Sequence, residues 1–156
     1  MTCVNPRIFP ARHIVGVMNR LPTDNSPGAQ SPSPTKPVTV YACSGCSDAG
    51  ELADRIARRL ARDGAAEMSC LAGIGGRVKS LVLTAENAGR ILAVDGCPLN
   101  CAAHTLKLAG FQKFDHLELH TIGLRKGSCP VTEEHIAAGV AAAKQIIAGE
   151  PKPEAA

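Results

Sequence analysis

A regular alternation of strand-like and helix-like segments is the feature that most constrains the fold of this chain. Runs of β-branched and apolar residues predict strands at 38–42 and 91–94, and shorter or alternating segments predict two more at 67–70 and 116–120. Strands separated by helical crossovers form parallel sheets with right-handed connections. We therefore predict a three-layer α/β fold, in which helices flank a small, mostly parallel sheet of about four strands in the order 2-1-3-4.

The helices are predicted from apolar spacing and from capping residues. A capping box starting at Asp48 begins the first helix, and Gly64 closes it. Arg58 and the arginines after it complement the end of this helix and are expected to stay solvated. Pro98 suits the first position of the third helix, with Leu99 facing inward. The predicted helical ranges are 48–63, 78–89, 98–109 and 132–147.

Five of the seven cysteines fall near the carboxyl edge of the predicted sheet, where open α/β sheets bind ligands. Cys43 and Cys46 follow the first strand, Cys97 and Cys101 follow the third, and Cys70 closes the second. Helix N-termini beside these thiols favour thiolates, the form that binds metal. Two short-spaced pairs can supply the four sulfurs that a structural Zn(II) site prefers. The sequence therefore predicts a cysteine-rich metal site at this edge.

Three segments resemble a known family. Residues 43–47, 69–75 and 95–102, the last of which reads Asp-Gly-Cys-Pro-Leu-Asn-Cys-Ala, are similar to the DGC-domain family. That family is named after its Asp-Gly-Cys motif, and its members are described as carrying four cysteines that bind metal. The resemblance covers residues 38–147, and it implies a metal site without naming a reaction.

Carried over to this sequence, the resemblance assigns the zinc ligands to Cys43, Cys46, Cys97 and Cys101. Cys70 lies in a matching segment, so it is a candidate fifth ligand or a redox thiol.

Other residues near the cysteine pairs are predicted to support such a site. Gly45 and Gly96 let the backbone turn tightly, and backbone N–H groups there can donate to the sulfurs. Asp95 is expected to hydrogen-bond the loop backbone just outside the ligands. His104 follows Cys101 by three residues and is a candidate for the same outer position, although a surface histidine is the simpler interpretation.

Three further residues are weaker candidates. Cys129 precedes Pro130 at the predicted site edge and could join the site, and His120 ends the fourth strand there. Cys3 lies far from the predicted domain and is expected to be free.

Composition divides the chain into three predicted parts. Residues 1–37 hold seven of the 11 prolines, among Ser, Thr, Asn and Gln, and are expected to form a disordered leader. Residues 38–148 form a single metal-binding α/β domain, and residues 149–156 a flexible tail.

The same composition excludes several classes of function. Apolar runs stay far below the roughly 20 residues that span a bilayer, and the start lacks the apolar core of a signal peptide. The net charge is +3, with basic and acidic residues interspersed, and the chain has only four aromatic residues. Neither feature is typical of a nucleic-acid-binding surface. We therefore expect a cytoplasmic protein that binds neither nucleic acid nor membrane, and the sequence names no other partner.

Three functions compete at the cysteine site, and the sequence leaves open whether the protein is an enzyme. The first is zinc binding. The second is thiol redox chemistry at the Cys-x-x-Cys pair of Cys43 and Cys46, although the chain lacks the later proline loop expected of thioredoxin-like folds. The third is an iron–sulfur protein, because four thiolates also hold a [4Fe–4S] cluster.

Overall fold

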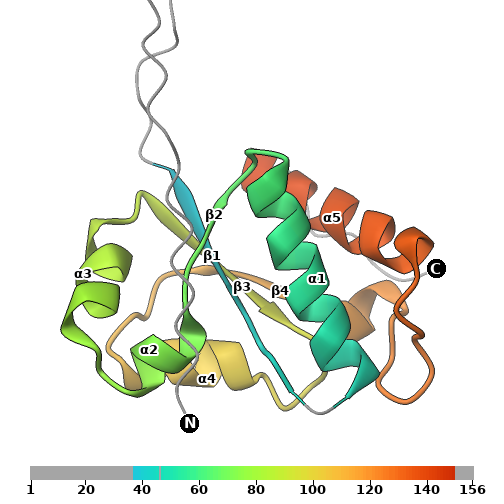
Figure 1. Ribbon diagram of the computed structural model, residues 1–156, viewed down its shortest axis with the longest axis horizontal. Helices are drawn as coiled ribbons and strands as arrows, with labels where there is room; N and C mark the ends of the chain where they lie inside the picture. The colour runs from blue at the N-terminus through green and yellow to red at the C-terminus, as the bar shows by residue number, and fades with distance from the viewer. Residues whose placement is uncertain (1–36, 46, 150–156) are drawn as a thin grey trace, which may run out of the picture. The chain divides into compact units, whose positions relative to one another are not determined.

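The computed structural model of the chain describes residues 37–45 and 47–149. In this part, four strands form one sheet in the order β2-β1-β3-β4, and every neighbouring pair is parallel. The predicted α/β class and strand order are therefore confirmed (Figure 1). The strands are β1 (Val38–Ala42), β2 (Glu67–Met68), β3 (Arg90–Asp95) and β4 (Asp115–Glu118).

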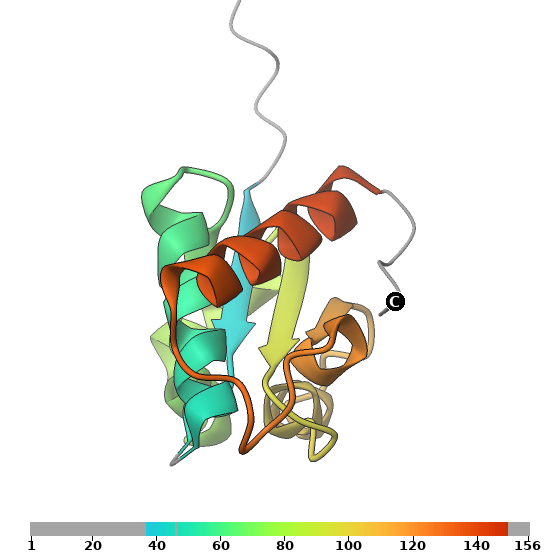
Figure 2. The same ribbon diagram turned by 90° about the vertical axis from the view of Figure 1, so that its right-hand side faces the viewer.

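Helices cover both faces of this sheet. The helical elements are α1 (Asp48–Arg62), α2 (Leu71–Gly75), α3 (Lys79–Asn87), α4 (Cys101–Leu108), the 3₁₀ turn η1 (Leu119–Ile122) and α5 (Glu133–Ala148). α1 and α5 pack together on one face, whereas α2, α3 and α4 lie on the other (Figures 1 and 2). The three layers predicted from the sequence are thus present.

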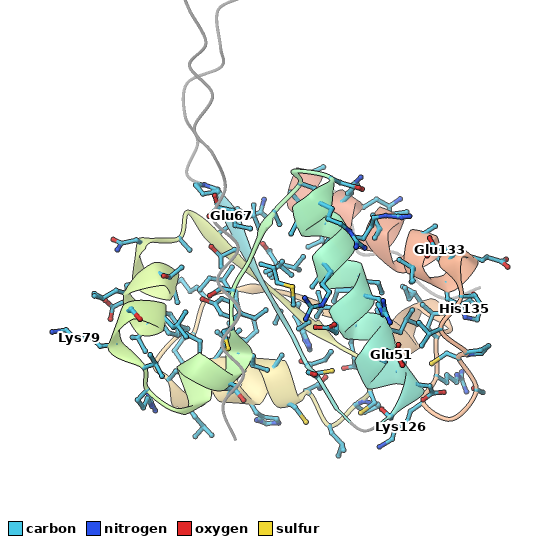
Figure 3. All side chains as sticks on the ribbon, viewed as in Figure 1. Glu51, Glu67, Lys79, Lys126, Glu133 and His135 are labelled. Carbon is cyan, nitrogen blue, oxygen red and sulfur yellow. The ribbon has the colours of Figure 1, made fainter. Side chains whose placement is uncertain are left out.

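The core follows from the alternation of side chains along each strand. In β1, Val40 and Ala42 pack beneath α1 and α5, whereas Tyr41 between them packs beneath α2, α3 and α4. A parallel strand covered on both faces needs apolar residues at most positions, which is what the two central strands, β1 and β3, supply. Charged side chains such as Glu51 on α1 and Glu133 on α5 project outward from the helices (Figure 3).

The N-cap of α1 differs from the prediction by one residue. Ser47 is the N-cap, and its hydroxyl accepts the N–H of Gly50 at 3.2 Å. Asp48 is instead the first helical residue, and its carboxylate accepts backbone N–H groups of Gly127 at 3.0 Å and Cys129 at 3.2 Å. The predicted capping box at Asp48 is therefore wrong, because that side chain ties the loop before α5 to α1.

α4 starts three residues later than predicted. Pro98 and Leu99 lie in a turn, and Leu99 is 66% exposed rather than inward. Asn100 precedes the helix in the left-handed region with φ of +50°. The helix begins at Cys101 because Asp95, at the end of β3, accepts the N–H groups of the next two residues.

Other boundaries also differ. The five-residue helix α2 is not predicted from the sequence, and the fourth strand ends at Glu118, so that His120 lies in η1. None of the helices in the described ranges is long and apolar enough to cross a membrane. The predicted leader and tail lie outside these ranges, apart from Pro37 and Gly149.

Candidate functional site

The carboxyl edge of the sheet gathers four of the predicted site cysteines. Cys43 follows β1, Cys70 follows β2, and Cys97 and Cys101 follow β3, so all four lie beyond strand ends that point the same way. All four are free thiols. Cys46, the remaining predicted ligand, lies outside the described residues, as does Cys3.

Cys43 connects the two cysteine loops. Its Sγ accepts the backbone N–H of Gly96 at 3.1 Å. Burial raises the pKa of the Cys43 thiol to about 11; the Gly96 hydrogen bond lowers it, and negative charge on Asp95, Cys101 and Cys97 raises it further. The Gly96 hydrogen bond therefore joins the loop after β1 to the loop that carries Cys97.

Gly96 is required by close packing against α1. A Cβ added there would lie 2.3 Å from the carbonyl oxygen of Ala49 and 2.5 Å from its carbonyl carbon. At Gly45, by contrast, an added Cβ would meet no atom within 4 Å, and its φ lies outside the left-handed region. Of the two glycines predicted to shape the loops, only Gly96 is constrained, and the predicted N–H donation to a sulfur comes from it.

Asp95 organises the start of the helix that carries Cys101. Its side chain is 1% exposed and accepts the N–H groups of Ala102 at 2.8 Å and Ala103 at 3.0 Å. His116 Nε2 lies 3.0 Å from Asp95 Oδ2, the oxygen that also accepts the Ala103 N–H. The expected bonding of Asp95 to backbone is present, but it is directed to α4 rather than to its own loop.

His116 was missed by the sequence analysis. The signal lies in the alternation of the fourth strand, which places His116 and Glu118 on one face. Glu118 pairs in register with Asp95, so His116 is a diagonal neighbour of that carboxylate.

The other candidates do not converge on Cys43. Cys70 is exposed at the start of α2, and its Sγ accepts the N–H of Gly73 at 3.4 Å. His104 is exposed on α4, and His120 pairs with Glu118. Within residues 37–45 and 47–149, no three His, Cys, Asp or Glu side chains are grouped closely enough to hold a metal ion.

Cys129 is buried in the core. It is 1% exposed, packs in the core cluster shared with α1 and α5, and its backbone N–H donates to Asp48. Burial raises the pKa of its thiol, and the Asp48 carboxylate beside it adds to this effect.

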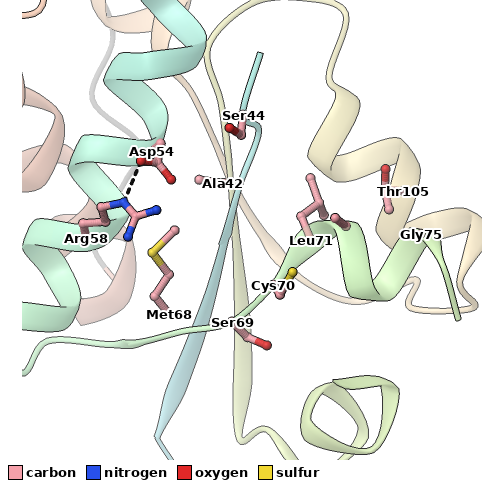
Figure 4. Close-up of a pocket in the computed structure, with 11 residues that line it drawn as sticks. Ala42, Ser44, Asp54, Arg58, Met68, Ser69, Cys70, Leu71, Gly75 and Thr105 are labelled. Atoms are coloured by element: carbon pink, nitrogen blue, oxygen red, sulfur yellow. Dashed lines mark hydrogen bonds and ion pairs between the residues drawn. The ribbon is translucent and has the colours of Figure 1, made fainter. Parts of the chain in front are cut away.

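A cavity of about 640 Å³ adjoins the cysteine loops (Figure 4). We call it the Cys70 cavity. Ser44 follows β1 on one wall, Arg58 reaches it from α1, and Met68, Cys70 and Thr105 complete its polar and apolar lining. From the sequence, Arg58 was expected only to complement the helix end and to stay solvated. The residues of α1 alone do not indicate that β2 and α2 lie opposite this side chain.

Fold and thiols together define a class: a small three-layer α/β domain with cysteine loops at the carboxyl edge of a parallel sheet. The DGC domain model matches residues 39–143, and the chain belongs to the DGC family. It is 48% identical over 95 residues to the anaerobic and virulence modulator AnvM of Pseudomonas aeruginosa strain PAO1, a match covering 60% of this chain and 72% of AnvM. No solved structure matches.

Proposed function

We propose that this domain binds one zinc ion at the carboxyl edge of its sheet. The proposed ligands are Cys43, Cys46, Cys97 and Cys101. The observation that carries the proposal is the hydrogen bond from Gly96 N–H to Cys43 Sγ, which joins the loop after β1 to the Asp-Gly-Cys loop after β3.

The donor chemistry fits zinc. Thiolates are preferred ligands of structural Zn(II), and a backbone N–H donated to a ligating sulfur orients and stabilises it. Metal binding would deprotonate Cys43, whose pKa is raised by burial, because a metal ion outweighs the local pKa effects of the protein.

The geometry indicates how such a site would close. Since no three potential ligands converge in the described part of the chain, zinc binding is expected to draw the thiols together. Cys97 lies in the turn between β3 and α4. Cys101 is held at the start of α4, where Asp95 accepts the helix amides. A reducing compartment such as the cytoplasm would keep these thiols available, and we propose that setting.

The test is the metal content of protein purified without oxygen, measured by elemental mass spectrometry. We expect about one zinc per chain. Iron accompanied by sulfide and a brown colour would refute the assignment in favour of a cluster. Protein without metal, in which Cys43 and Cys46 interconvert between dithiol and disulfide, would favour the redox alternative.

Single substitutions test the ligand set. Replacing any one of the four ligands by Ser is expected to remove the zinc, whereas Cys70→Ser should retain it. Cys70 is the matched control because it is an exposed thiol at the same edge outside the proposed set. Zinc lost from Cys70→Ser and kept by Cys43→Ser would contradict the assignment.

A further inference from the structure

The Cys70 cavity has the dimensions of a small-molecule site. Its volume of about 640 Å³ lies within the roughly 300–1,000 Å³ usual for ligand pockets. It opens between α1 on one side and α2 and α4 on the other, over the ends of β1 and β2 (Figure 4). None of the proposed zinc ligands that the structure describes lines it.

Arg58 provides the cationic wall of this cavity. Its Nε donates to Asp54 Oδ2 at 2.7 Å, and this bond holds the guanidinium so that its end is directed into the cavity (Figure 4). Within the described residues, its two terminal nitrogens donate to no protein group. A guanidinium presenting two parallel N–H groups matches the two oxygens of a carboxylate.

Cys70 provides a sulfur on the opposite wall. The thiol is exposed, and its Sγ accepts the backbone N–H of Gly73 at 3.4 Å. Hydroxyls of Ser44, Ser69 and Thr105 and the apolar side chain of Met68 line the space between the two walls.

A second, independent observation lies behind this wall. The Tyr41 side chain is fully buried, and its hydroxyl makes no well-formed hydrogen bond within the described part of the chain. Burial raises the pKa of this hydroxyl, a weak hydrogen bond with the Ser69 side chain lowers it, and charge on Cys70 raises it. Tyr41 does not itself line the cavity, but Ser69 and Cys70 do. A buried hydroxyl behind a cavity wall, without a well-formed hydrogen bond, is a polar group left for a ligand or a water to satisfy.

We propose that the Cys70 cavity binds low-molecular-weight disulfides that carry a carboxylate, and that Cys70 forms a mixed disulfide with them. Arg58 binds the carboxylate, and the Cys70 thiolate attacks one sulfur of the ligand. The ligand S–S bond breaks, a bond forms between Cys70 Sγ and the attacked sulfur, and the other half leaves as a thiolate that takes up a proton. Cys70 is thereby oxidised and the leaving half reduced, so no further oxidant is required.

Two probes with the same disulfide and opposite charge test the proposal. Dithiodipropionate carries a carboxylate two carbons from each sulfur, and cystamine carries an ammonium at the same position. The full-length protein is exposed to each, quenched, and digested after Lys and Arg, which leaves Cys70 as the single cysteine of peptide 63–77. Mass spectrometry of that peptide gives the rate of mixed-disulfide formation, and zinc content is measured on the same samples.

Arg55 supplies a matched control for Arg58. Both arginines lie on α1 and pair with an acidic residue four positions earlier, but only Arg58 lines the cavity. We expect Arg58→Gln to slow the reaction with dithiodipropionate about tenfold, the loss of one charge-assisted hydrogen-bonding group, and to leave or raise the rate with cystamine. Arg55→Gln, which changes the net charge equally, should react as the unmodified protein does.

The proposal is overturned if the two arginine variants react alike. It is also overturned if dithiodipropionate modifies the peptide with Cys97 and Cys101 before peptide 63–77. Cys70→Ser should abolish the modification at 63–77 while keeping its zinc. Because labelling and metal content are separate readouts, protein that forms the mixed disulfide without binding zinc would refute the proposed function alone.

Discussion

Replacing Gly96 by Ala tests whether the Asp-Gly-Cys loop must press against α1. The added Cβ would stand 2.3 Å from the Ala49 carbonyl oxygen, where ordinary contact begins at 3.4 Å, so the two atoms overlap by about 1 Å. Both neighbouring groups are backbone of the first turn of α1, and they cannot rotate away as a side chain can. Either the loop or the helix must move.

The cost can be estimated from overpacking in other cores, where it is about 1–3 kcal/mol. We expect the upper end, about 3 kcal/mol, because the overlap is with backbone and because moving Gly96 also disturbs its N–H bond to Cys43. For a domain of this size, 1 kcal/mol corresponds to about 4 °C in Tm, so the transition should fall by about 12 °C.

Gly45→Ala is the matched control in the partner loop. An added Cβ there meets nothing within 4 Å, so this variant should lie within about 0.5 kcal/mol of the unmodified protein or be slightly more stable. Urea unfolding followed by circular dichroism gives both free energies of unfolding. If Gly96→Ala is as stable as Gly45→Ala, the close approach of the loop to α1 is not what requires glycine.

Two further predictions concern carboxylates. Asp95→Asn should lower the free energy of unfolding by about 2–3 kcal/mol, because a buried charge that caps two α4 amides is lost. Asp115→Asn is the control: Asp115 forms an exposed ion pair with Arg90, and its loss should cost about 0–1 kcal/mol in the same urea assay. Hydrogen bonds from the Gly127 and Ala49 N–H groups lower the pKa of Asp48 below its usual value of 3.8. The contribution of Asp48 to stability is therefore present above pH 3.8 and is lost as the pH falls through the lowered pKa. Asp48→Asn should therefore be less stable than the unmodified protein at pH 7, with a difference that shrinks below about pH 4; a constant difference would contradict this reasoning.

The sheet could be predicted from the sequence because its strands carry their signal locally. The segments 38–42 and 91–94 are continuous apolar runs, and the alternation with helices leaves few arrangements for four parallel strands. The helix starts were harder. Capping rules, which consider only neighbouring positions in the sequence, favoured Asp48 and Pro98. The side chain that caps α4 is Asp95 at the end of β3, six residues before Cys101, so these rules do not find it.

The sequence predicts which edge of the sheet carries the site, but not how the site residues are arranged there. The spacing of Cys43 and Cys97 after two neighbouring strands located both thiols correctly at the carboxyl end of the sheet. The Cys70 cavity was not predictable, because its walls come from α1, β2 and α4, and only their packing places Arg58 opposite Cys70. His116 was missed for the same reason, since its partner lies on another strand.

Asp95 and Gly96 of the Asp-Gly-Cys segment act on two different parts of the molecule. Asp95, the last residue of β3, points its buried carboxylate at α4 and fixes where that helix begins. Gly96 faces the other way, fits against the first turn of α1, and donates its N–H to Cys43. Cys97 follows in the turn between β3 and α4. The folded sheet and both helices thus fix the two ends of the Cys97 loop, and a metal bound here would only have to draw the thiols together between fixed ends.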